Sequence, residues 1–350
     1  MIIGCVYYQF NDENGIKNCL IRLLNSPTFD VDKLDYILRD NQMSGFDGVS
    51  IDSYRLLNSV TAVRYEEDIY PAFGKSAISV LENISLAKTQ QERWIFNHPV
   101  VKYDSYLLTE AIFQISRIES SASTEYIKNV FSEHALSKDG FRYNQRTYRL
   151  LSDIDVLHDM KNHIDISEIE QYFIRQSRFR PVWKSFAEYN VLFNVKRSRF
   201  TLDAFKKSFL YWFNYVDIHK TYQVNEEKYM QLQTDISSGI AQPQSLFLIS
   251  YLRQFCFDKK IAFNLVILSA NNPGERFSSL GDIYLRFNGL DRFDSGCEPC
   301  KYSDVYMSQS NEPMQVEDNK FFYLYSKEYI DKNEIASFLT KQDFSLYIKR

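Results

Sequence analysis

The stretch that decides the fold reads Thr28-Phe29-Asp30-Val31-Asp32-Lys33-Leu34-Asp35-Tyr36-Ile37-Leu38-Arg39-Asp40. Its apolar residues recur at helical spacing and predict an amphipathic helix with one buried side: Val31, Leu34, Ile37 and Leu38. Steps of four residues advance the angle around a helix by only about 40°, so Asp32, Tyr36 and Asp40 are expected to share one face. Asp35 and Arg39 have the spacing of an ordinary helix salt bridge. A plain solvent-exposed helix side has the same acidic spacing, so spacing alone assigns no function.

The sequence of this stretch resembles that of the HD-domain deoxynucleoside triphosphate triphosphohydrolases. Three further features follow in that family's order: Gly45, Ile51-Asp52 and Arg55-Leu56-Leu57. The family helix carries the last of four metal ligands, an Asp that corresponds to Asp32. The resemblance further implies that Lys33 contacts phosphate and that Tyr36 and Asp40 contact the sugar of a bound deoxynucleotide.

A second match to that family follows at Ala87-Lys88 and Trp94-Ile95-Phe96-Asn97-His98. Lys88 occupies the place of a phosphate-binding Arg, and it keeps the charge but lacks the bidentate fork of a guanidinium. Phe96 stands where the family has a sugar-stacking Tyr, and Asn97 matches a polar residue near the base. An exposed helix lysine is the alternative interpretation of Lys88. His98 precedes Pro99 and is interpreted as a turn residue.

A metal site of the HD type needs a His, a His-Asp pair and a distant Asp, a ligand set that suits Mg, Mn, Fe, Ni or Zn. All five histidines follow Asp32, whereas the family places its histidine ligands before it: His98, His134, His158, His163 and His219. The dipeptide His158-Asp159 lies in a segment whose family counterpart is structural, so it is not expected to bind metal. A divalent cofactor is therefore predicted only if an upstream segment or a partner chain supplies the missing ligands.

Composition sets the broad class of the protein. The 350 residues are 45% hydrophobic and 25% charged, a normal globular balance, and the net charge of −4 gives no general attraction to nucleic acid or to anionic membranes. No apolar run approaches the roughly 18 residues of a membrane helix. An odd number of scattered cysteines predicts a reducing, cytoplasmic setting: Cys5, Cys19, Cys256, Cys297 and Cys300. Cys297-Glu-Pro-Cys300 has the spacing of half a zinc site, but no second pair completes it, so a loop with thiols is expected.

The predicted fold is mostly α. Residues 1–180 are assigned to the C-terminal part of an HD-type helical domain, and residues 181–350 to a helical segment followed by a smaller α+β lobe. Helices are expected at 16–24, 76–92, 103–118, 124–134, from Ser152 onward, at 168–180, two within 226–257, and at 333–339. A short helix and a strand pair are expected within 46–75, and strands at 261–270, 282–287, 302–307 and 321–325.

Basic and aromatic residues interleave between residues 175 and 207. The cations are Arg175, Arg178, Arg180, Lys184, Lys196, Arg197, Arg199, Lys206 and Lys207. The aromatic residues are Phe179, Trp183, Tyr189, Phe193 and Phe200. The favoured interpretation is a set of helices with buried aromatic faces and wet charged faces. The alternative is a surface for single-stranded nucleic acid or an anionic effector.

Three hypotheses of function remain at this point. In the first, the chain is part of a dNTP phosphohydrolase that is incomplete or inactive alone, and the apolar start of the chain favours a missing upstream segment or a partner carrying the His and His-Asp ligands. In the second, it is a pseudoenzyme that acts as a regulatory or interaction subunit, since Lys88 and Phe96 both depart from the family pattern. In the third, it binds nucleic acid. Homo-oligomers are common in the family, and no membrane association is expected.

Overall fold

The structure is a computed structural model. It describes residues 15–26, 30–45, 49–65, 68–118, 130, 133–143, 145–194, 199–219, 222–271, 283–287, 300–302, 320–342 and 344. The chain folds into two compact units: unit 1 comprises Met1–Phe96 and Asn271–Asn319, and unit 2 comprises Asn97–Ala270 and Lys320–Arg350. The units are discontinuous in sequence and differ from the predicted division at residue 180, because the chain returns to unit 1 after residue 270. The protein is mostly α-helical, with a smaller α+β part.

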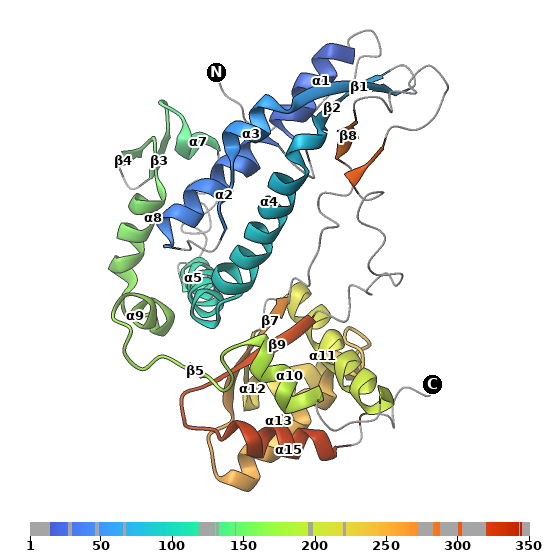
Figure 1. The fold of residues 1–350 in the computed structure, drawn as a ribbon. Coiled ribbons are helices and arrows are strands. Elements are labelled where there is room, and N and C mark those ends of the chain that lie inside the picture. Colours follow the sequence, from blue (N-terminus) through green and yellow to red (C-terminus); the bar gives the residue numbers. More distant parts are fainter. Residues whose placement is uncertain are drawn as a thin grey trace. The chain divides into compact units, whose positions relative to one another are not determined.

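Unit 1 combines short helices with a small sheet (Figure 1). Its helical elements are α1 (Gly15–Leu24), α2 (Val31–Met43), α3 (Ser53–Asn58), η1 (Lys75–Ala77), α4 (Ile78–Gln91) and η2 (Glu92–Phe96). Strands β1 (Val60–Tyr65) and β2 (Asp68–Gly74) form the antiparallel pair expected from the sequence, and β8 (Tyr284–Arg286) joins β2 in parallel. Ile283 and Leu285 are buried in the same cluster as Leu81 and Ile84 of α4. The run at 282–287 thus completes the sheet of unit 1 and was wrongly assigned to the C-terminal lobe.

Unit 2 contains most of the helices that the structure describes. These are α5 (Pro99–Ile118), α7 (Glu133–Leu136), α8 (Asp153–Met160), η3 (Lys161–His163), α9 (Ser167–Phe173), α10 (Phe186–Asn194), α11 (Arg199–His219), α12 (Glu226–Ser237), α13 (Ser245–Lys259) and α15 (Lys332–Lys341). A hairpin joins β3 (Phe141–Tyr143) and β4 (Arg146–Tyr148), and a second sheet has the order β5 (Arg180–Pro181), β9 (Lys320–Ser326), β7 (Asn264–Asn271), β6 (Gln223–Asn225).

Strand β9 is the centre of the unit 2 core. Its residues Phe321 to Tyr325 are all buried, as expected for an inner strand with both faces covered. The ring of Phe322 lies 5.2 Å from that of Trp183, measured between centroids, and the indole Nε1 of Trp183 donates to the carbonyl of Phe322 at 2.6 Å. The aromatic residues Phe179, Trp183, Tyr189 and Phe193 are buried, which confirms the core interpretation for these members of the 175–207 tract. Phe200 has no described side chain.

Most expected elements of the described part are confirmed, with two notable exceptions. The helix predicted for 168–180 ends at Phe173, and Arg175 and Ser177 adopt positive φ angles of 61° and 54°, which no α-helix contains. Helix α1 exists, but its apolar residues Ile16, Leu20 and Leu24 are exposed instead of buried. The helix predicted at 124–134 and the strand predicted at 302–307 lie largely outside the described residues. No helix among the described residues has both the length and the apolar character that a membrane crossing requires.

We expect the Phe322→Ala substitution to lower the free energy of unfolding of unit 2 by about 3–5 kcal/mol, because it leaves a cavity in a dry aromatic core. Urea denaturation followed by tryptophan fluorescence measures this, since Trp183 and Trp212 are both buried in that core. Phe257→Ala is the matched control, because Phe257 is 79% exposed; its effect should stay within about 0.5 kcal/mol. Equal effects of the two substitutions would contradict the central place of β9.

Candidate functional site

Helix α2 begins with a buried aspartate. The carboxylate of Asp30 caps the helix: Oδ1 accepts from the backbone N–H of Lys33 at 2.8 Å, and Oδ2 accepts from the backbone N–H of Ser26 at 2.9 Å. The ammonium of Lys33 lies 2.6 Å from Oδ2 of Asp30. Burial alone would raise the pKa of Asp30, but the hydrogen bonds from Lys33 and Ser26 outweigh it and hold that pKa below its ordinary value.

The side chain of Lys33 is already engaged by this cap. Its Nζ donates to the carbonyl oxygen of Ser26 at 2.6 Å as well as to Asp30. The predicted phosphate contact of Lys33 therefore competes with two hydrogen bonds inside the fold. Asp32, the predicted metal ligand, is exposed in the first turn of the helix and makes no hydrogen bond or ion pair with any described residue.

A buried amide joins α2 to α4. The Nε2 of Gln91 donates to the carbonyl oxygen of Ile37 at 3.0 Å and to Oδ1 of Asn41 at 2.8 Å. Gln91 is almost fully buried, and Leu34 and Ile37 pack in the same cluster as Leu81 and Ile84 of α4. Figure 1 shows the two helices side by side in unit 1. The C-terminal end of α4 is therefore fixed against the middle of α2.

Tyr36 experiences the charges of both helices. Burial raises the pKa of its phenol, and the carboxylates of Asp30, Glu92, Asp32 and Asp40 raise it further. Glu92 begins η2, directly after α4, while the other three belong to α2 or its cap. Glu92 is therefore the residue beyond α2 that acts on Tyr36, and Lys88 precedes Glu92 by one helical turn on α4.

The remaining charges on this face are weakly paired. Lys88 is half-buried in the last turn of α4 and makes no hydrogen bond or ion pair through its side chain with the described residues. The predicted pair of Asp35 and Arg39 is confirmed at 3.1 Å, and both side chains are 62% exposed, so the bridge adds little stability. Arg39 Nε also lies 4.0 Å from the Oδ1 of Asp40. Asp40 thus shares its charge with a neighbour, whereas Lys88 does not.

Helix α4 continues into a π-helical turn. Residues Glu92 to Phe96 form η2, a conformation that is rare and often found at functional sites. Its widened turn leaves Trp94 and Phe96 about half exposed. Asn97 belongs to unit 2, where its carbonyl oxygen accepts a hydrogen bond from the hydroxyl of Tyr323 at 3.0 Å. The predicted residues Asp32, Lys33, Tyr36 and Asp40 thus share α2, and Glu92 of η2 acts on Tyr36. Lys88 on α4 and Phe96 on η2 belong to the same unit, but no contact among the described residues joins either to that α2 group, and Asn97 belongs to unit 2.

His98 is a helix-start residue. Pro99 is the first residue of α5, and the Nδ1 of His98 accepts from the backbone N–H of Val100 at 3.3 Å. This confirms the turn interpretation. Among the described residues, neither His158 nor His163 lies in a cluster of potential metal ligands.

The described residues do not fit a divalent metal. No group of three or more His, Cys, Asp or Glu side chains within the described part of the chain could hold an ion. Asp32 alone cannot bind a divalent cation against the competition of water. Of the Cys297/Cys300 pair, only Cys300 lies within the described residues. No chemical step through a metal is therefore assigned to these residues.

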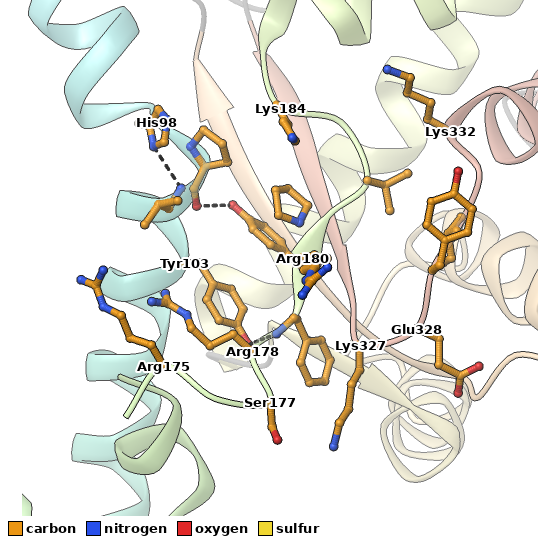
Figure 2. A pocket seen from close by; sticks show the side chains of 18 of the residues that line it. His98, Tyr103, Arg175, Ser177, Arg178, Arg180, Lys184, Lys327, Glu328 and Lys332 are labelled. Carbon is orange, nitrogen blue, oxygen red and sulfur yellow. Dashed lines mark hydrogen bonds between the residues drawn. The ribbon is translucent and has the colours of Figure 1, made fainter. Parts of the chain in front are cut away.

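Unit 2 holds a pocket of about 1180 Å³ that the sequence did not delimit (Figure 2). Three segments line it: 98–103 at the start of α5, 175–184 around β5, and 325–332 after β9. Arg180 pairs with Ser326 in the sheet, so Lys327 follows directly beyond the partner of Arg180. That register brings together cations that lie far apart in the sequence, and only those at 175–184 were singled out beforehand.

The floor of this pocket is aromatic and rigid. The rings of Tyr103 and Tyr325 stack with centroids 5.0 Å apart. The hydroxyl of Tyr103 donates to Oε1 of Gln171 at 2.7 Å, and the hydroxyl of Tyr325 donates to the carbonyl oxygen of Pro99 at 2.7 Å. Burial raises the pKa of both phenols, so they stay protonated donors at neutral pH. Arg178 pairs with Asp104 and lies over the ring of Tyr103.

The loop between α9 and β5 carries two strained residues. Arg175 and Ser177 occupy the left-handed region of backbone conformation, where a side chain other than that of glycine costs about 1–2 kcal/mol. Both residues line the pocket and are exposed. Strain of this kind persists where the surrounding structure imposes it, and it gathers at functional sites.

We expect Asp30→Ala to lower the free energy of unfolding of unit 1 by about 1–3 kcal/mol, because it removes a helix cap and leaves Lys33 without its partner. Asp30→Asn should cost less, since an amide oxygen still caps the helix. Because the folded-state pKa of Asp30 is lowered, its ionic contribution is present above the unfolded pKa of about 4 and is lost as the pH falls through the folded value.

The measurement is the urea midpoint of the wild-type and Asp30→Asn proteins between pH 7 and pH 3. The difference between them should shrink below about pH 4. Asp35→Asn is the matched control, since Asp35 is exposed and its pair with Arg39 lies in solvent. A difference that persists unchanged at pH 3 would show that Asp30 acts through packing alone.

No protein-family model matches the chain. One curated protein is similar to part of it: an uncharacterized protein, MJ1154, of Methanocaldococcus jannaschii, with 26% identity over 115 residues. The match covers 30% of this chain and 26% of that archaeal protein, so the chain corresponds to about a quarter of its relative's length.

Proposed function

We propose that this chain is an HD-phosphohydrolase-like protein whose unit 1 binds a deoxynucleoside triphosphate at the face of α2 and the end of α4. In this proposal Lys88 contacts the phosphates, and Tyr36 and Asp40 contact the sugar. Phe96 packs against the nucleoside from η2, and the predicted role of Asn97 is not part of the proposal because Asn97 belongs to unit 2.

One observation carries the proposal: the side chain of Gln91, the last residue of α4, is hydrogen-bonded to Ile37 and Asn41 of α2, and carboxylates of α2 and of η2 both raise the pKa of Tyr36. The hydrogen bonds of Gln91 fix that arrangement, so a ligand would meet a preformed surface and not two independent helices. Lys88 adds a cation with no partner among the described residues. A π-helical turn at the same end of α4 agrees with a functional role for this corner of unit 1.

The same residues lead us to propose that the chain alone does not hydrolyse nucleotides. Asp32 is the single residue on this face that matches a metal ligand of the HD family, and the described residues form no metal cluster. If a partner chain or further sequence supplied the His and His-Asp ligands, a bound divalent ion would provide the nucleophile and clamp the phosphate. This chain's residues would then position the nucleotide.

A regulatory or interaction subunit without catalysis is the second candidate. Helix α1 favours it, because Ile16, Leu20 and Leu24 form an exposed apolar stripe at steps of four residues. The engagement of Lys33 with Asp30 and Ser26 also favours it, since that lysine is not available without breaking the cap. The same stripe would serve a partner that completes the metal site.

We further propose a cytoplasmic location. Cys19, Cys256 and Cys300 are thiols and form no disulfide among the described residues, as expected in a reducing compartment. Burial raises the pKa of the Cys256 thiol to about 11, so that cysteine is structural and not a reactive nucleophile.

We expect dATP or dGTP, each with Mg²⁺, to bind the full chain, and Lys88→Ala to weaken that binding about tenfold or more because it removes a charged hydrogen-bond donor. Isothermal titration calorimetry measures the dissociation constants. Lys75→Ala is the matched control: Lys75 is an exposed lysine of unit 1 with no partner among the described residues, and it lies in η1, before α4. Nucleotide binding that responds equally to both substitutions, or that is absent, would refute the site.

We expect no release of inorganic triphosphate from dATP or dGTP by the chain alone in Mg²⁺, Mn²⁺, Fe²⁺, Ni²⁺ or Zn²⁺. Phosphate-release assays with each metal in turn measure this. Turnover that disappears in Asp32→Ala would show that the chain assembles a metal site by itself, and the proposal of an incomplete enzyme would fall. Binding without turnover supports it. In cells, an Asp32→Ala variant that keeps its effect supports the regulatory alternative.

A further inference from the structure

The pocket of unit 2 has an excess of positive charge once internal partners are counted. Arg178 is neutralised by Asp104, and Lys332 is neutralised by Glu188. Lys184 lies close enough to Glu188 to lower the pKa of that carboxyl. The side chains of Arg175, Arg180 and Lys327 make no hydrogen bond or ion pair within the described part of the chain.

The two carboxylates that line the pocket are committed to the backbone. Oδ1 of Asp331 accepts from the N–H groups of Asn333 and Glu334 and so caps α15. Glu328 accepts from the backbone N–H of Ala262 at 3.2 Å. The fold therefore sets the geometry of both side chains. Three unpaired cations therefore remain for a ligand.

The cations are spread along the pocket and do not converge on one point. Figure 2 shows Arg175 on the loop before β5 and Arg180 on β5 itself, with Lys327 on the segment that follows β9. The pocket volume of about 1180 Å³ exceeds the roughly 300–1,000 Å³ typical of small-molecule sites. Spread cations in a large pocket suit several phosphates in a row better than a single anion.

The exposure of the aromatic residues determines where a base of the ligand can stack in this pocket. Tyr103 and Tyr325 are buried in the floor and hold the fold through their hydroxyls, so they offer no free ring face. Tyr329 lines the same pocket and is 85% exposed, which makes its ring accessible to a base. The contacts therefore favour the phosphate backbone, with one stacking position at the rim.

We propose that this pocket binds the phosphodiester backbone of a single-stranded nucleic acid, with Arg175, Arg180 and Lys327 on the phosphates and Tyr329 against a base. Because the phosphate contacts dominate, affinity depends strongly on salt and little on sequence. Arg175 lines the pocket in a strained backbone conformation, and strain of this kind gathers at functional sites. The inference concerns unit 2 alone and does not depend on the nucleotide site of unit 1.

The test is fluorescence anisotropy of a labelled single strand of about 12 nucleotides, titrated with the full chain at several salt concentrations. The logarithm of the association constant should fall with the logarithm of salt, with a slope of about −0.7 per phosphate contacted. Arg180→Ala and Lys327→Ala should each weaken binding several-fold and reduce the slope by about 0.7. Arg146→Ala is the control, since Arg146 is an exposed arginine of unit 2 outside the pocket.

A matched pair of glycine substitutions separates charge from loop conformation. Arg175→Gly and Ser177→Gly both relieve a positive φ angle, but only the first removes a cation. We expect Arg175→Gly to weaken strand binding and Ser177→Gly to leave it unchanged, with neither lowering the melting temperature. Equal effects of the two on binding would overturn the assignment of Arg175.

Four competitors identify the source of the phosphate. Unlabelled single strand should displace the labelled strand, whereas dATP, inorganic triphosphate and a duplex of the same sequence should do so only at far higher concentration. Displacement by dATP or triphosphate at least as effective as by the strand would replace the proposal with a small-anion site. No binding at low salt, or binding unchanged in the combined Arg180→Ala and Lys327→Ala variant, would refute it. Lys88→Ala should leave strand binding intact, which keeps this test separate from that of unit 1.

Discussion

The candidate site of unit 1 depends on the side-chain amide of Gln91. Its two hydrogen bonds tie the backbone of Ile37 and the side chain of Asn41 to the last residue of α4. A buried amide that lost both partners would cost about 1–3 kcal/mol for each unsatisfied group, so the helices cannot separate or slide freely. The Oε1 of Gln91 is buried and has no hydrogen-bond partner among the described residues.

The electrostatics of that face impose a requirement on its ligand. Four carboxylates raise the pKa of Tyr36, whereas the cations of α2 are already engaged: Lys33 is held by Asp30, and Arg39 pairs with Asp35 and lies beside Asp40. A bare triphosphate would meet more negative than positive charge at close range, which disfavours binding. A nucleotide that carries its own Mg²⁺ has a smaller net charge and avoids most of this repulsion. The nucleotide proposal therefore applies only to a metal-complexed triphosphate. Attraction of its phosphates to this face then depends on Lys88.

Features that follow from local sequence were predictable, and those that follow from tertiary pairing were not. The helix at 31–40, the Asp35–Arg39 bridge and the β1–β2 pair all arise from periodicity and short-range contacts. The engagement of Lys33 was not visible, because it depends on a turn that brings the carbonyl of Ser26 to the helix start. The parallel addition of β8 to β2 was also hidden, since a three-residue strand gives no signal of its distant partner.

The pocket of unit 2 is a second feature that depends on tertiary pairing and was not predictable from the sequence. The basic tract at 175–184 was evident from the sequence. The helix predicted for 168–180, however, would have distributed these cations around the helix axis. The positive φ angles at Arg175 and Ser177 exclude a helix at these residues. The register of β5 against β9 then places Lys327, from the C-terminal part of the chain, beside the basic tract. The buried aromatic residues between the cations serve the core, so charge and aromaticity, interleaved in the sequence, are separated in space. That separation is the physical reason why the pocket is suited to phosphates first and to bases second.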